Sequence, residues 1–354
     1  MRVLCTVAFC LFTFFYLMFY QADVMVVAQH IASGGQTHYV PWMGGILITL
    51  VLKLLQIGVN ALFGLYKRLH ALTYLPSLLV LAFITNISPH VYDKIDLGAW
   101  VWIFPLVLAV FSLLAFFSRK LQAIEPEVRY NGPSSQLNWI NLSILFLLMV
   151  GVGLIGNGNK VFHLRAAVER KIMKGDFSGA LEIGKNCDKT DASLTMLRAY
   201  SLAKERQLPE RLFHYALTPG AASLTPNGKD VYALMLVPQS VITNKVKTNR
   251  HYQLCGLLMD KNLKEFSKVL SLYYAPDSVL PTHYAEAMAL CRTSASVSNS
   301  GRHEQDSVMS VRYLRFMNQM KKAGCQPLLQ KSFRQQFGNT YWYYYYVRSR
   351  KNSV

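Results

Sequence analysis

The chain has 354 residues, of which 52% are hydrophobic, and it carries a formal net charge of +18 at pH 7. Only 16% of its residues are charged, well below the roughly 25% that is usual in soluble domains. This composition excludes an ordinary soluble protein along the whole length, while the length leaves room for two or three domains with sizeable cores.

The charged residues are unevenly distributed along the chain. Residues 1–157 contain eight Lys and Arg and five Asp and Glu, whereas residues 158–354 contain 29 and 14, a net charge of +15. A charge-poor half followed by a charge-rich half predicts a membrane domain at 1–157 and a water-facing domain at 158–354.

Five apolar stretches make up the first half. Each approaches or exceeds the ~17–25 residues that a helix needs to cross about 30 Å of hydrocarbon. The first stretch ends in Phe19, Tyr20 and Gln21, which are too bulky for a signal-peptide cleavage site, so we expect an uncleaved anchor. The predicted membrane bundle is all-α, with spans at about 3–20, 44–65, 71–87, 97–117 and 137–155.

The basic residues of the short connections indicate how the spans are oriented. Arg2 precedes the first span, the connection 21–43 has no Lys or Arg, Lys67 and Arg68 follow the second span, and basic residues recur at 119–129. This alternation predicts a multi-pass protein of the bacterial inner membrane, with the N-terminus inside and the C-terminal domain in the periplasm. One observation opposes this orientation, since positive charge beside a span normally stays in the cytoplasm and five basic residues follow the fifth span: Lys160, Arg165, Arg170, Lys171 and Lys174. We give these residues less weight because long domains cross the membrane largely regardless of charge.

Four cysteines lie in the second half: Cys187, Cys255, Cys291 and Cys325. Their spacing matches no zinc pattern and no C-x-x-C redox pair. In an oxidising compartment they could form up to two disulfides; alternatively, most of them are small buried apolar residues on helix faces.

Apolar residues repeat at helical spacing throughout the second half, for example from Val161 to Ile172 and from Tyr252 to Met259. Tight polar turns separate the predicted helices, and Asn262 followed by Glu265 is a start signal of the capping-box type. Short helices joined by tight turns favour antiparallel pairs stacked as an α-helical repeat domain. A helical bundle without repeats is the alternative.

One stretch, KIMKGDFSGALEIGKN, resembles the middle of a tetratricopeptide repeat. That repeat has a turn like the Gly-Asp pair here, an aromatic residue like Phe177 and a small residue like Ala180. The chain restarts at Leu208, 31 positions after Phe177, near the repeat's period of about 34 residues. Leu164 stands where the repeat favours Trp, and the proline near the repeat end is missing.

Three further stretches, HYQLCGLLMDKNLKEF, LPTHYAEAM and NTYWYYYY, follow one another in order within 250–346. Together with the five spans they resemble a family of uncharacterised integral membrane proteins from Bacteroides-type bacteria. The resemblance implies a tetratricopeptide-like domain on the outer face of a membrane anchor. It implies no known activity and no site residues.

Lys53 is the most unusual residue of the membrane half, because an ionised lysine near the middle of a span costs about 2.5–3.5 kcal/mol on insertion scales. Gln56 and Asn60 follow at three and seven positions, so all three share one helix face. The stripe is either a site for an ion, a proton or a lipid headgroup, or a set of hydrogen bonds between helices with a snorkelling lysine.

The two predicted outer loops contain His30, His38, His90 and Asp93. These residues could converge on a metal or acid–base site, but nothing in their spacing requires it, and we predict no metal and no cofactor. His283 and Glu286 lie three apart, which favours a contact on a helix surface over half of a metal site. The sequence contains no phosphate loop, no G-x-S-x-G and no H-E-x-x-H motif, and GVGLIG at 151–156 is explained by small-residue packing of membrane helices.

The chain ends in six consecutive aromatic residues followed by basic ones. So many large rings favour burial, and we expect the segment to close the open end of the last helix pair. The alternatives are rings at the bilayer interface with the basic residues at headgroup phosphates, or a sugar-binding platform. The residues concerned are Tyr341, Trp342, Tyr343, Arg348 and Arg350.

These features predict an integral membrane protein that presents a helical-repeat domain outside the cytoplasm to bind a protein of the cell envelope. An exported location argues against nucleic acid as the partner of the basic half, and the lipid bilayer is the other expected contact. One alternative is a membrane-embedded transferase that acts on lipid-linked or anionic lipid substrates through Lys53 or the outer-loop residues. Another is a transport accessory subunit.

Overall fold

The structure of the protein is a computed structural model. The structure describes residues 2–86, 98–122, 135–226, 242–243, 249–276, 278–294, 304–325 and 327–348. All regular secondary structure in these ranges is helical. The chain divides into two compact units, Met1–Ala166, called here the membrane unit, and Ala167–Val354, called here the helical unit.

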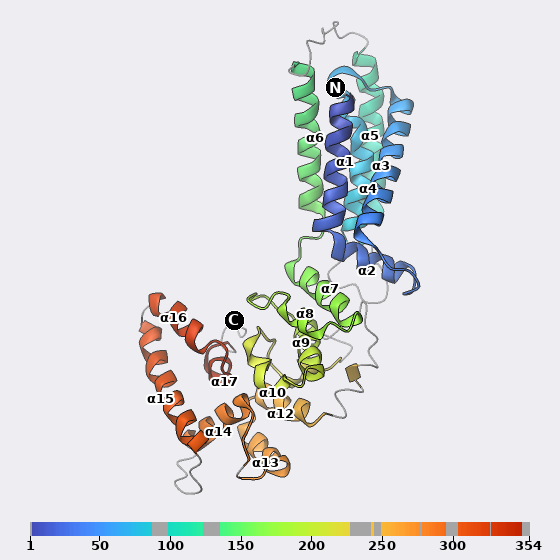
Figure 1. Ribbon diagram of the computed structural model, residues 1–354. Coiled ribbons are helices and arrows are strands. Elements are labelled where there is room, and N and C mark those ends of the chain that lie inside the picture. The colour runs from blue at the N-terminus through green and yellow to red at the C-terminus, as the bar shows by residue number, and fades with distance from the viewer. Residues whose placement is uncertain are drawn as a thin grey trace. The chain divides into compact units, whose positions relative to one another are not determined.

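Five helical segments of the membrane unit are long and apolar enough to cross a membrane, namely Arg2–Tyr20, Pro41–Phe63, Lys67–Thr85, Trp100–Arg119 and Gln136–Ile155. This confirms the prediction of about five spans, and the long helices run side by side in Figure 1. The segments consist of α1 (Arg2–Phe15) with η1 (Tyr16–Tyr20), α3 (Pro41–Phe63), η2 (Lys67–Tyr74) with α4 (Leu75–Thr85), α5 (Trp100–Gln122) and α6 (Gln136–Ile155).

The structure differs from the prediction in the connection 21–43. A loop was expected there, but residues Ala22–Ala32 form a further helix, α2. This helix is too short to span a bilayer, but it buries an apolar face that includes Val24 and Val27. A second difference is the 3₁₀ helix η2, which replaces the expected short turn at Lys67 and Arg68.

The bundle buries few side chains and exposes many large apolar ones. Its interior contains Phe9, Leu52 and Leu81, whereas Leu54 and Leu147 are 66% and 67% exposed. Exposed apolar surface on this scale is the face that a membrane bundle turns to lipid. The main helix contacts pair α6 with η2, α1 with α3, α3 with α4, and α4 with α6.

The helical unit is built from short helices connected by tight turns (Figure 1). Neighbouring helices in the chain pack on one another, as α8 on α9, α12 on α13, α14 on α15 and α15 on α16. The elements are α7 (Lys160–Met173), which begins in the membrane unit, α8 (Phe177–Glu182), α9 (Ala192–Lys204), α10 (Leu208–Arg211), η3 (Leu212–His214), η4 (Ala221–Leu224), α12 (Arg250–Met259), α13 (Leu263–Tyr273), α14 (Thr282–Ser294), α15 (Glu304–Cys325), α16 (Pro327–Phe337), α17 (Tyr341–Tyr343) and η5 (Tyr344–Arg348).

Side-chain caps explain why these helices begin where they do. Asp176, Asp191 and Asn262 each accept a hydrogen bond from the backbone N–H three residues later, which satisfies one of the unpaired donors at a helix start. The start predicted at Asn262 is therefore confirmed. Gly175 provides the turn before α8 with a left-handed backbone, at φ +74°, which glycine adopts without steric cost.

Candidate functional site

The most unusual polar site of the membrane unit surrounds Lys53 on α3. Its Nζ donates hydrogen bonds to Gln56 Oε1 at 2.6 Å, to Thr6 Oγ1 at 2.9 Å and to the Tyr74 hydroxyl at 3.5 Å. The ammonium group also lies 5.2 Å from the centre of the Tyr74 ring, within the range of a cation–π interaction. Three spans, α1, α3 and η2–α4, thus contribute to one site.

The polar contacts continue from Lys53 toward the end of the bundle where η2 begins. Gln56 Nε2 donates to Thr73 Oγ1 at 2.8 Å, and the Thr73 hydroxyl donates to the His70 carbonyl at 2.8 Å. On the neighbouring helix α6, Asn141 accepts from the Ala71 N–H and donates to the Lys67 carbonyl, both at 2.8 Å. Side chains of four helical segments therefore line a polar interior on this side of the bundle.

Of the three residues on the predicted polar helix face, Lys53, Gln56 and Asn60, two contact each other in the structure. Lys53 and Gln56 are hydrogen-bonded to each other, whereas Asn60 Oδ1 is buried without a hydrogen-bond partner among the described residues. The stripe does make hydrogen bonds between helices, as the structural interpretation expected. A role in binding an ion, a proton or a lipid stays a prediction.

All groups that contact the Lys53 ammonium are neutral. In the described part of the membrane unit the only acidic residue is Asp23, which belongs to α2. Burying a cation is costly unless an anion accompanies it. The three neutral acceptors satisfy the hydrogen-bonding capacity of Lys53 but leave its charge uncompensated.

The predicted outer-loop residues are only partly described. His30 lies at the end of α2, and its pKa is lowered by burial and, to a smaller extent, by His38. His90 and Asp93 lie outside the described residues. Within the described ranges, no group of three His, Cys, Asp or Glu side chains could hold a metal ion.

The second candidate site lies in the helical unit, where the aromatic segment Tyr341–Tyr346 enters the core. Trp342 is fully buried, and Tyr341 and Tyr344 are at most 1% exposed. The Tyr341 N–H donates to Glu286 Oε2 at 2.7 Å, and the Trp342 indole N–H donates to the Glu286 carbonyl at 2.7 Å. The side-chain carboxylate and the backbone carbonyl of Glu286 on α14 thus both hold the start of α17.

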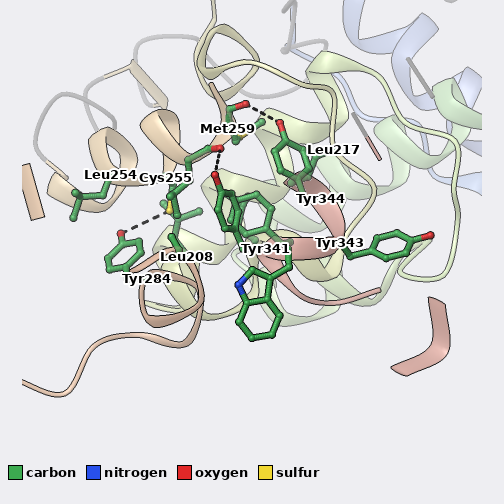
Figure 2. Packing of buried hydrophobic residues seen from close by; sticks show 14 of the residues in the cluster. Leu208, Leu217, Leu254, Cys255, Met259, Tyr284, Tyr341, Tyr343 and Tyr344 are labelled. Carbon is green, nitrogen blue, oxygen red and sulfur yellow. Dashed lines mark hydrogen bonds between the residues drawn. The ribbon is translucent and has the colours of Figure 1, made fainter. Parts of the chain in front are cut away.

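Two tyrosine hydroxyls of the aromatic segment cap the C-terminal end of α12 (Figure 2). Tyr341 donates to the Leu258 carbonyl at 3.1 Å, and Tyr344 donates to the Met259 carbonyl at 2.9 Å. Carbonyls in the last turn of a helix lack partners within it. Burial raises the pKa of both phenols, so they stay protonated and able to donate.

The aromatic segment packs against the last helix pair, α15 and α16, as the sequence predicted. The Trp342 ring centre lies 5.3 Å from that of Tyr313 and 5.8 Å from that of Phe316, both on α15, and the rings of Tyr343 and Phe333 of α16 are 5.8 Å apart. The segment also contacts α14, the end of α12 and Phe213 of η3. The rings of Tyr341–Tyr344 are buried in protein and therefore present no platform to sugar or lipid. The side chain of Arg348 and all of Arg350 lie outside the described residues.

His283 and Glu286 are in contact, but the expectation of a surface contact was wrong. Each side chain is 1% exposed, and His283 Nδ1 lies 2.9 Å from Glu286 Oε2. The same carboxylate oxygen accepts from Tyr341. Sequence reasoning missed this link, since spacing along α14 does not tell which face of the helix turns inward.

The cysteines of the helical unit are unpaired where their side chains are described. Cys187, Cys255 and Cys291 are free thiols, and Cys255 is fully buried. The Cys255 thiol lies 3.7 Å from the Tyr284 hydroxyl, and burial raises its pKa to about 12. The Cys325 side chain lies outside the described residues.

The exposed side of α15 carries an unusual set of residues, which we call the cationic face. Val308, Val311 and Leu314 are 58–60% exposed, and residues 308–323 contain four cations and no acid. None of these cations forms an ion pair among the described residues, whereas Lys171, Lys185 and Arg334 do. The cationic face consists of these three aliphatic residues with Arg312, Arg315, Lys321 and Lys322.

Together these features define an all-helical, multi-span membrane protein with a second helical unit. A model of a protein family of unknown function, DUF6057, matches residues 243–348. The match runs from just before α12 to the end of η5 and includes Glu286, the aromatic segment and the cationic face. No curated protein and no solved structure matches the chain.

Proposed function

We propose that the chain is a membrane-anchored binding protein whose helical unit binds an acidic protein through the cationic face. The observation that carries this proposal is the row of four exposed cations on α15 without an ion-pair partner among the described residues. Like charges crowded on one face repel each other, and an acidic partner relieves that repulsion.

The aliphatic residues of the cationic face favour a protein over a lipid surface. Val308, Val311 and Leu314 follow one another at intervals of three, which forms a ridge of the kind that packs into the groove of another helix. Helices that lie in a membrane surface usually insert Trp, Phe or Leu, and of these the cationic face exposes Leu314 alone among its described residues. The described aromatic residues of α15, Tyr313 and Phe316, are buried in the core instead.

The charges of the short connections support the proposed location in the cell. Basic residues at the start of α1 and at η2 place those ends inside under the positive-inside rule. With the five candidate spans of the described residues, this orientation would put the helical unit outside, in the bacterial envelope, as a tetratricopeptide-like binding domain on an inner-membrane anchor. A surface for an envelope protein fits such a position, and scaffolding requires no covalent chemistry.

The proposal is tested by photocrosslinking in intact cells. A photoreactive amino acid replaces Leu314 in the cationic face, and the same residue replaces Leu272, which is 77% exposed on α13, as a control. A discrete protein adduct is expected from position 314 only. The adduct should weaken at high salt, because exposed charges are screened beyond about 8–10 Å.

Charge reversal identifies the chemistry of the partner. Arg312→Glu with Arg315→Glu should reduce the adduct roughly tenfold or more, whereas the matched change Lys264→Glu with Lys268→Glu on exposed α13 should leave it unchanged. The proposal would be contradicted if positions 314 and 272 gave the same amount of crosslinked protein. It would also be contradicted if the charge reversal at Arg312 and Arg315 left the amount of adduct unchanged. Crosslinks to lipid alone would assign the face to the membrane surface and refute a protein partner.

A further inference from the structure

We propose that Lys53, Thr6 and Tyr74 form a binding site for the carboxylate or phosphate group of a membrane amphiphile, which enters from the lipid between α1 and α3. This site is separate from the cationic face and does not depend on the function proposed for it. Its starting point is the uncompensated charge of Lys53, whose hydrogen-bond acceptors are all neutral.

The site is accessible from the lipid side of the bundle. Lys53 and Thr6, which meet across the contact of α1 with α3, are both only half-buried. The residues beside them, Val7, Leu50 and Leu54, are 49%, 58% and 66% exposed. An acyl chain lying on these apolar side chains would bring its charged head to the ammonium group, where hydrocarbon around the pair strengthens their attraction.

The site is reached from the basic end of the bundle, with Thr6 near that end and Lys53 deeper, ten residues, or about 15 Å, from Phe63 at the end of α3. Thr6 is four residues beyond Arg2, which corresponds to about 6 Å along an α-helix. Lys67 and Arg68 begin the neighbouring segment η2, so this end of the bundle is basic. Basic residues near the bilayer surface attract anionic headgroups, and the polar side chains of Gln56 and Thr73 extend the hydrophilic interior toward that end.

The contacts around Lys53 would have to rearrange only locally for an anion to join them. The Tyr74 hydroxyl, at 3.5 Å, is the most distant of the three acceptors, so an oxyanion can replace it at the ammonium group at little cost. The Thr6 and Tyr74 hydroxyls lie 3.0 Å apart, and both can turn to donate to the same oxyanion. The site would then supply one hydrogen bond from the ammonium group and two from hydroxyls, all three charge-assisted because their acceptor is ionised.

The test measures lipid binding to the full chain in nanodiscs of zwitterionic phosphatidylcholine. Oleate supplies the carboxylate source, phosphatidic acid the phosphate-lipid source, and inorganic phosphate the source without an acyl chain. Saturable binding of one equivalent of oleate or phosphatidic acid is expected by native mass spectrometry, with no retention of inorganic phosphate. Retention of inorganic phosphate alone, or of no probe, would overturn the proposal.

Variants separate specific binding from general attraction. Lys53→Gln should weaken binding roughly 10- to 100-fold, the loss of one charge-assisted hydrogen bond, and Lys53→Arg should retain it. Tyr74→Phe should give a smaller loss with the charge intact, which keeps the test decisive if Lys53→Gln fails to fold. The control Arg119→Gln removes an exposed charge of α5 and should have no effect. Equal binding by wild type and both site variants would refute the site.

Discussion

Replacing Glu286 with Ala is expected to destabilise the helical unit by about 2–6 kcal/mol. The carboxylate accepts hydrogen bonds from His283 Nδ1 at 2.9 Å and from the Tyr341 N–H at 2.7 Å, and its side chain is 1% exposed. Each buried donor that loses its partner costs about 1–3 kcal/mol. For a unit of this size the change corresponds to a melting temperature lower by roughly 5–20 °C.

The assay is thermal unfolding of the full chain in detergent, combined with hydrogen exchange of the peptide that contains Tyr341 and Trp342. Glu286→Ala should expose these amides to exchange before the rest of the unit, because the start of α17 loses its acceptor. Glu286→Gln, which retains one carbonyl acceptor, should cost less than the Ala variant. The control Glu182→Ala, at a side chain that is 63% exposed, should change stability by less than about 1 kcal/mol. Equal melting temperatures for wild type and Glu286→Ala would refute the buried contact.

Two further outcomes are expected for the helical unit. Tyr344→Phe removes the hydroxyl that caps the Met259 carbonyl and should lower the free energy of unfolding, measured in urea, by about 1 kcal/mol; an unchanged value would show that the carbonyl has another partner. Burial, with His283 and Arg211 nearby, lowers the pKa of His214 from 6.5 to about 4, so the unfolded chain takes up this proton first as the pH falls. The stabilising contribution of neutral His214 is therefore complete above pH 6.5 and is lost toward pH 4. Urea midpoints at pH 7 and pH 4.5 should differ less in His214→Gln than in wild type, and an identical difference would exclude His214 as the cause.

The membrane unit was largely predictable because hydrocarbon thickness dictates both the length and the composition of a span. The span predicted at 44–65 corresponds to α3, Pro41–Phe63. Spacing along one helix likewise predicted that Lys53 and Gln56 lie together. The partners Thr6 and Tyr74 come from other helices, and no pattern within α3 indicates which neighbour it meets.

The helical unit shows the same division between local and distant information. Burial of the aromatic segment followed from the area of its rings, whereas its partner Glu286 is 55 residues away from Tyr341. Periodicity along α14 gives no information about a contact over that distance. The signal available in the sequence was the joint occurrence of LPTHYAEAM and NTYWYYYY, and the family match covers both stretches.

Accessibility of the helical unit in intact cells tests the central claim of an envelope-facing binding unit most directly. Protease added to spheroplasts should digest the chain beyond Ile155, the end of the fifth span, and leave a membrane-embedded fragment. A cytoplasmic marker protein in the same sample should stay intact as a control. Digestion of the helical unit only after lysis would place it in the cytoplasm and contradict the proposed envelope partner.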